Sequence, residues 1–106
     1  AVPSTVKVGI YHRTFAEKGV EVIAPDEKYQ DMTTEAIFAV KAGQIGPDIQ
    51  RLAAEAGEYL AARGAEAVIA GCTEIPLILK NGDISVPVVD ATQVLAAAVV
   101  KFARGI

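Results

Sequence analysis

Apolar residues recur along this chain with two different spacings, and each spacing predicts a different kind of secondary structure. Repeats at three- and four-residue spacing predict helices over residues 6–17, 31–42, 47–63, 74–80 and 91–103. Short runs rich in β-branched residues predict strands over residues 20–24, 67–71 and 86–89. Glycine, proline or an Asn-Gly turn separates most of these segments, which supports the predicted boundaries.

The residues that repeat at helical spacing are expected to face a shared hydrophobic core. In the first predicted helix these residues are Tyr11 and Phe15, and in the second they include Ile37 and Val40. In the last predicted helix the inward face consists of Val94, Leu95, Ala98 and Phe102.

Strands that alternate with helices indicate parallel strand pairing through right-handed crossovers. The chain is therefore predicted to be a single α/β domain over residues 1–106, a flavodoxin-like or Rossmann-like sandwich with a parallel sheet. The first predicted helix has no strand before it, only the residues Ala1 to Ser4. We expect that a strand precedes residue 1 and that the chain is part of something longer.

Composition narrows the possible functions. Hydrophobic residues make up 52% of the 106 residues and charged residues 22%, a balance typical of a globular domain. The net charge of −3, with no cluster of basic residues, disfavours nucleic acid as a partner. No apolar run approaches the roughly 20 residues of a membrane span. A single cysteine forms no internal disulfide and favours the cytoplasm. One cysteine and one histidine are too few for a structural metal site.

Ligands of parallel α/β sheets bind beyond the carboxyl ends of the strands, where the sequence places Gly71-Cys72-Thr73-Glu74. A cysteine just before a helix favours the reactive thiolate, and free amides there attract a carboxylate. Thr73 is expected to cap that helix. A plain packing role for Cys72 is the alternative. Asp26, Asp90 and Thr92 also follow predicted strands, as pocket residues or as turn and cap residues. His12 is expected to be at the surface or partly packed.

Five motifs together resemble the aspartate/glutamate racemase superfamily, in particular its aspartate racemase branch. They are TVKVGIYHRTF from Thr5, VEVIAPDEKYQ from Val20, AVKAG from Ala39, GCTEIPLIL from Gly71 and VPVVDATQVLA from Val86. They occur in the order found in that family, and the resemblance covers nearly the whole chain.

The resemblance implies one lobe of a two-lobed enzyme that works without pyridoxal phosphate or another cofactor, as a homodimer. Two cysteines on opposite sides of the substrate α-carbon remove and return a proton, and Cys72 matches the second of them. Lys41 matches a lysine that pairs with a substrate carboxylate, and Thr73 and Thr5 match substrate-binding positions. Glu74 resembles an acidic residue that assists the neighbouring cysteine. The implied substrate is aspartate or a related acidic amino acid.

The family's other catalytic cysteine has no counterpart here, so the chain alone is expected to be inactive. A non-catalytic α/β fragment or binding module is therefore an alternative interpretation. Hydantoin racemases, maleate isomerases and arylmalonate decarboxylases have a similar architecture and remain alternative enzyme classes. The decarboxylases use a single catalytic cysteine.

Overall fold

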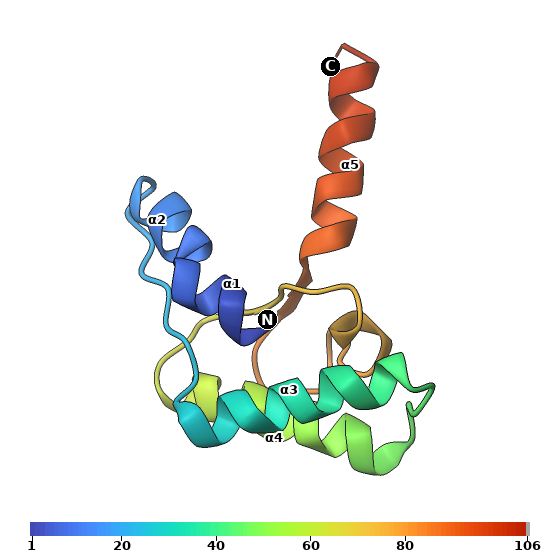
Figure 1. Ribbon diagram of the computed structural model, residues 1–106. Helices are drawn as coiled ribbons and strands as arrows, with labels where there is room; N and C mark the ends of the chain where they lie inside the picture. The colour runs from blue at the N-terminus through green and yellow to red at the C-terminus, as the bar shows by residue number, and fades with distance from the viewer. Residues whose placement is uncertain (106) are drawn as a thin grey trace.

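The computed structural model describes residues 1–105 and arranges them around a small sheet (Figure 1). In chain order the elements are α1 (Pro3–Val8), α2 (Ile10–Ala16), α3 (Glu27–Lys41), α4 (Pro47–Ala62), β1 (Val68–Ala70), the 3-10 helix η1 (Ile75–Leu77), β2 (Val88–Asp90) and α5 (Ala91–Ala103). Helices α3 and α4 lie side by side on one side of the strands, and α1, α2 and α5 extend from the other side.

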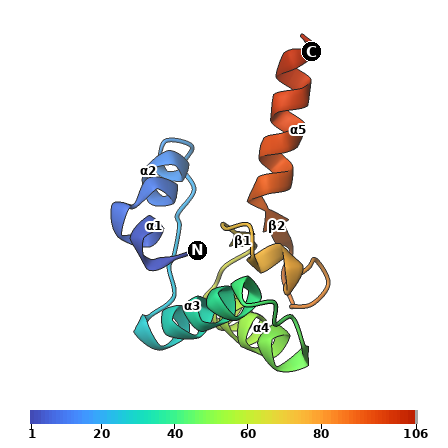
Figure 2. The same ribbon diagram turned by 45° about the vertical axis from the view of Figure 1, so that its right-hand side comes forward.

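The strands β1 and β2 pair in parallel, with Val68 opposite Val88 and Ala70 opposite Asp90 (Figure 2). The chain therefore has an α/β fold with a parallel sheet, as the sequence predicts. The third strand predicted over residues 20–24 is wrong, because this segment has no regular secondary structure. Its β-branched residues favour an extended backbone, but a strand also needs a hydrogen-bonded neighbour. Within residues 1–105 the sheet consists of β1 and β2 alone.

Helices α3 and α4 form the most densely packed part of the molecule. Asp26 begins α3 by accepting a hydrogen bond from the Tyr29 amide at 3.2 Å, and Pro47 begins α4. The predicted inward faces are confirmed in their central turns. The buried residues of these two helices are Ala36, Ile37, Val40, Ala53, Ala56 and Gly57.

The hydrophobic core lies between these two helices and the segment that runs from β1 to β2. Its remaining members are Val68, Ala70, Ile75, Ile78, Leu79 and Ile84. Small residues on α4 allow this segment to approach closely, since a Cβ added to Gly57 would lie 2.9 Å from Cδ1 of Ile84. The core therefore fixes the position of the loop that follows β1.

The amino-terminal helix differs from the prediction. A single helix over residues 6–17 is predicted, but Gly9 adopts a left-handed backbone with φ 73° and separates α1 from α2. Neither helix has a buried residue, so the prediction that Tyr11 and Phe15 lie in the core is wrong. Instead, the two aromatic rings are partly buried and stack on each other, with centroids 6.4 Å apart.

The carboxyl-terminal helix has the predicted bounds but not the predicted burial. Asp90 caps α5 by accepting hydrogen bonds from the amides of Thr92 and Gln93 at 2.9 and 3.1 Å. The helix then projects away from the body and packs chiefly against β2. Its expected inward face is therefore exposed, including Leu95 at 63% and Phe102 at 87%. Among residues 1–105, no helix has the length and apolar character needed to cross a membrane.

Candidate active site

Cys72 lies two residues beyond the last residue of β1, at the carboxyl edge of the parallel sheet, as the sequence predicts. Asp90 marks the end of the neighbouring strand β2 and is opposite Ala70. The side chain of Cys72 is partly buried and packs against the hydrophobic core. The core therefore holds the Cys72 side chain in position, while the exposed part of this side chain is accessible from solvent.

The turn after Cys72 differs from the one that the sequence predicts. A helix over residues 74–80 is expected, but η1 covers only Ile75–Leu77, with Glu74 at its amino-terminal cap position. Thr73 does not cap it. The Thr73 hydroxyl donates a hydrogen bond to Oε2 of Glu74 at 3.1 Å instead. One 3-10 turn has a far weaker dipole than a long helix, so side chains rather than a helix terminus must supply the charge at this site.

Lys41 and Glu74 meet although they are far apart in the sequence. Lys41 is the last residue of α3, and its Nζ lies 4.0 Å from Oε1 of Glu74. The ammonium group also lies 5.5 Å from the centre of the Phe38 ring. The Lys41 side chain is 51% exposed and that of Glu74 is 21% exposed. An ion pair this open is weak, so the ammonium group is free to exchange partners.

Several neighbours act on the pKa of Glu74. Partial desolvation raises this pKa, but hydrogen bonds from the backbone amide of Glu74 and from Thr73 lower it. The positive charge of Lys41 and the Cys72 thiol lower it further, and the net pKa lies below the ordinary value of 4.5. Glu74 is therefore an ionised carboxylate at neutral pH, two residues after Cys72 in the chain.

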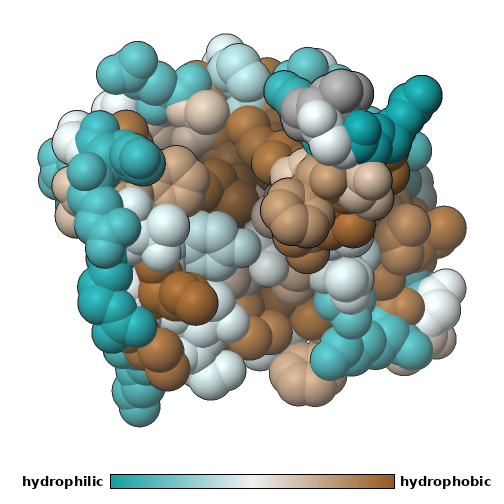
Figure 3. Space-filling view, turned by 90° about the horizontal axis from the view of Figure 1, so that it is seen from above, coloured by the Kyte–Doolittle hydropathy of each residue, from teal (hydrophilic) through white to brown (hydrophobic). Residues whose placement is uncertain are grey.

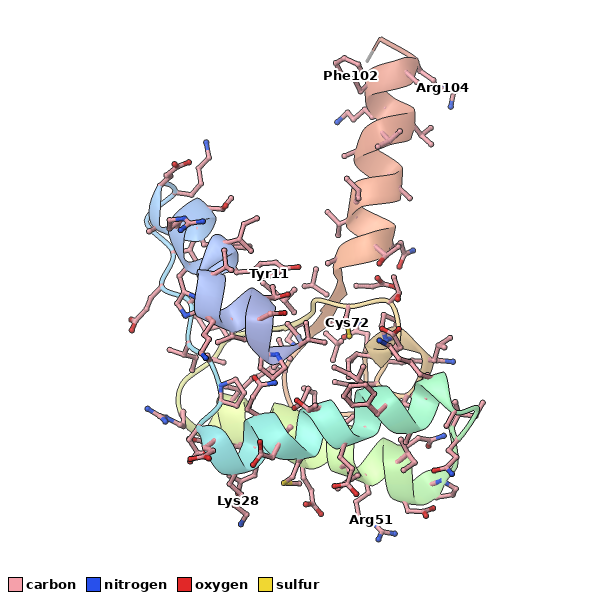
Figure 4. All side chains as sticks on the ribbon, viewed as in Figure 1. Tyr11, Lys28, Arg51, Cys72, Phe102 and Arg104 are labelled. Atoms are coloured by element: carbon pink, nitrogen blue, oxygen red, sulfur yellow. The ribbon has the colours of Figure 1, made fainter. Side chains whose placement is uncertain are left out.

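Thr5 lies apart from Cys72, Glu74 and Lys41, on α1. It lines an open hollow of about 490 Å³ together with Ile10, Tyr11, Thr14 and Phe15. Figure 3 shows apolar side chains gathered around a recess on this face of the molecule. Tyr11 connects the hollow to the sheet, because its hydroxyl lies 3.2 Å from the position of a Cβ on Gly71. In Figure 4 its side chain points from α2 toward the middle of the molecule, where Cys72 lies.

The structure thus brings Cys72, Thr73, Glu74 and Lys41 together, and places Thr5 in the adjoining hollow. Asp26 and Asp90 act as helix caps, Asp90 also lines a second hollow together with Pro76, and His12 is partly buried. The sequence interpretation missed Tyr11, which it assigned to the core. The available signal was Gly71, a glycine directly before the candidate cysteine.

Comparison with known proteins defines the class of protein. The profile of the family described as Asp/Glu/hydantoin racemase matches residues 1–99. The chain belongs to this family, which confirms the resemblance seen in its motifs. It is also 35% identical over 104 residues to a protein of Pectobacterium carotovorum subsp. carotovorum encoded in the pnlA 3′ region. That match covers 96% of this chain and 69% of the relative.

Two solved structures share the fold. A candidate Asp/Glu racemase from Yersinia pestis is 34% identical, with a TM-score of 0.80, over 90% of this chain and 42% of its own. An aspartate racemase homologue from Pyrococcus horikoshii OT3 is 30% identical, with a TM-score of 0.83, over 97% of this chain and 46% of its own. The chain therefore spans less than half the length of either solved relative.

Proposed function

We propose that this chain supplies one catalytic half of a cofactor-independent racemase that acts on aspartate or a related acidic amino acid. The observation that carries the proposal is the cluster of Cys72, Glu74 and Lys41 beyond the carboxyl end of β1. This cluster unites a thiol, a carboxylate two residues further along the chain and a cation that is available to a ligand. Membership of the Asp/Glu/hydantoin racemase family supports the same reaction class.

In the proposed reaction the Cys72 thiolate removes the proton from the substrate α-carbon. The C–H bond breaks, its electron pair stays on the α-carbon, and the proton forms an S–H bond on Cys72. A second thiol, supplied by a part of the enzyme outside this chain, donates its proton to the opposite face and so inverts the centre. After turnover the Cys72 thiol loses its proton to solvent and the second thiolate takes one up, which restores the starting state. The ionised Glu74 accepts a hydrogen bond from the thiol form of Cys72 and so positions it.

The exposure of Lys41 favours an acidic substrate. Its side chain is 51% exposed, and its ammonium group is held by the 4.0 Å contact with Glu74 and by the Phe38 ring at 5.5 Å. The side-chain carboxylate of aspartate can replace the Glu74 carboxylate as the partner of this ammonium group. An apolar amino acid or a hydantoin has no second carboxylate to place there.

Racemase assays of the chain, expressed with any adjoining coding sequence, test this proposal. We expect turnover of L-aspartate to D-aspartate, and we expect Cys72→Ser to reduce it by at least about a hundredfold. A serine hydroxyl preserves the size of the side chain but is far too weakly acidic to act as the base near neutral pH. Circular dichroism controls for folding. Near-normal turnover by the folded variant would contradict the proposal and leave Cys72 as a packing residue.

A further inference from the structure

Helices α1 and α2 form a unit that is loosely attached to the rest of the molecule. They pack chiefly against each other, and neither contributes a buried residue. The attachment at the start of the unit consists of Val2, which packs against the core, and of Gln30, whose Nε2 donates to the Ala1 carbonyl at 2.9 Å. Both contacts involve residues that precede α1. A separate contact from α2 is therefore needed to fix the distance between α2 and the sheet.

Tyr11 makes that contact. Its hydroxyl oxygen lies 3.2 Å, and its Cε2 atom 3.4 Å, from the position that a Cβ on Gly71 would occupy. Gly71 does not have a positive φ, so the backbone conformation alone does not require glycine here. The Tyr11 side chain, together with the Ala1 Cβ at 3.4 Å, leaves little room for a larger residue at this position. The Tyr11 ring therefore lies close beside Gly71, the residue before Cys72.

The Tyr11 ring is itself held in place. It stacks on Phe15 with an interplanar angle of 25°, and both rings line the hollow that also contains Thr5. The Tyr11 ring thus lines this hollow and also contacts Gly71, the residue before Cys72. It therefore sets how far the hollow lies from Cys72. Removal of the ring would widen the approach to the thiol, whereas loss of the hydroxyl alone would keep the ring carbon Cε2 at 3.4 Å from the Cβ position on Gly71.

We propose that Tyr11 is a positioning residue whose ring, seated on Gly71, sets the width of the opening through which a ligand reaches Cys72. The identity of that ligand as an amino acid rests on the proposed function. The positioning role depends only on the contact between the two residues, so it is measurable without turnover.

The test uses the fact that Cys72 is the only cysteine in the chain, so that alkylation rates report on this site alone. Rates are measured with iodoacetamide, which is small, and with N-phenylmaleimide, which is bulky. Tyr11→Ala is expected to raise the ratio of the bulky to the small reagent's rate by about threefold or more. Tyr11→Phe is expected to keep the original ratio. Thr14→Ala is the matched control, because Thr14 lines the same hollow but lies away from Gly71.

A double-mutant cycle makes the test independent of any general loosening. Gly71→Ala adds a Cβ against the ring and is expected to change the ratio more in the original chain than in the Tyr11→Ala background, where only the contact with the Ala1 Cβ at 3.4 Å remains. Equal effects of Gly71→Ala in both backgrounds would overturn the proposal, as would an unchanged ratio in Tyr11→Ala. Circular dichroism establishes that each variant is folded. A failed racemase assay would leave these rates unaffected, so the two proposals can fail separately.

Discussion

At the scale of single residues, the ammonium group of Lys41 has two possible partners, the Glu74 carboxylate and a substrate carboxylate. In the free protein its ammonium group lies 4.0 Å from Glu74, and in the proposed complex it pairs with a substrate carboxylate. In an active polypeptide that contains this chain, we expect Lys41→Ala to raise KM for aspartate by about fivefold, which corresponds to the ~1 kcal/mol of an exposed ion pair. Steady-state kinetics with aspartate and with an apolar amino acid measure the difference.

Lys28→Ala provides the matched control for this prediction. Lys28 is an exposed lysine of the same helix, but it lies in the first turn of α3 rather than the last. Its replacement is expected to leave both KM values unchanged. An equal loss for both substrates in Lys41→Ala would mean that Lys41 is structural.

The lowered pKa of Glu74 makes a pH-dependent contribution to stability. Because its pKa in the folded state lies below the ordinary value of 4.5, the ionised carboxylate stabilises the folded chain above the pKa of the unfolded chain. This contribution is lost as the pH falls through the lowered pKa. We expect Glu74→Gln to lower the urea midpoint at pH 7, and the difference to disappear in acid. A constant difference at both pH values would contradict this assignment.

The sequence predicts Cys72, Glu74 and Lys41 as candidate site residues, but it does not predict how they meet. Cys72 and Glu74 follow a recognisable strand, so their place at its carboxyl end is predictable. The contact of Lys41 with Glu74 depends on how α3 packs against η1, which no local pattern encodes. Tyr11 was misassigned because its helical spacing resembles that of a core residue, while its actual partner is the backbone of Gly71.

At the scale of elements, the packing of α4 against the segment before β2 depends on Gly57. We expect Gly57→Leu to destabilise the chain by about 1–2 kcal/mol, although leucine is the better helix former. The reason is overpacking, since even a Cβ would lie 2.9 Å from Ile84 and 3.8 Å from Leu79. Urea denaturation measures the change.

Ala62→Leu, at the exposed end of the same helix, is the control for Gly57→Leu and is expected to have almost no effect. A Gly57→Leu variant as stable as the original chain would show that Ile84 moves aside at little cost.

Element boundaries were predictable where a local signal marks them. Pro47 marks the start of α4 and Asp90 caps α5, and both helices begin where expected. The break between α1 and α2 depends on the backbone that Gly9 adopts, which helical spacing does not reveal. Burial was less predictable, because an apolar helix face such as that of α5 is buried only where another element lies against it.

At the scale of the whole molecule, a two-cysteine reaction needs an acid and a base on opposite faces of one carbon. The chain has one cysteine, so we expect no measurable aspartate racemisation by these 106 residues alone. We do not expect a second copy of this chain to supply the second thiol, because each Cys72 packs partly against its own core. The assay is incubation with L-aspartate in heavy water, followed by NMR and chiral analysis.

Two outcomes of this incubation are informative. D-aspartate above the buffer control, lost in Cys72→Ser, would contradict the prediction and indicate an active dimer. Deuterium at the α-carbon without inversion would agree with the prediction and indicate that Cys72 alone removes and returns the proton on one face.

The projection of α5 from the body implies an uneven distribution of local stability. No residue of α5 is buried, so the helix depends on its own hydrogen bonds and on the cap from Asp90. Helices of this length are marginal in water without tertiary support. Its amides therefore exchange with solvent through local opening, while those of α3 and α4 exchange only when the core itself opens. Any surface that packs against Leu95 and Phe102 will slow this exchange. Slower amide exchange in α5 would therefore show that another surface covers the helix.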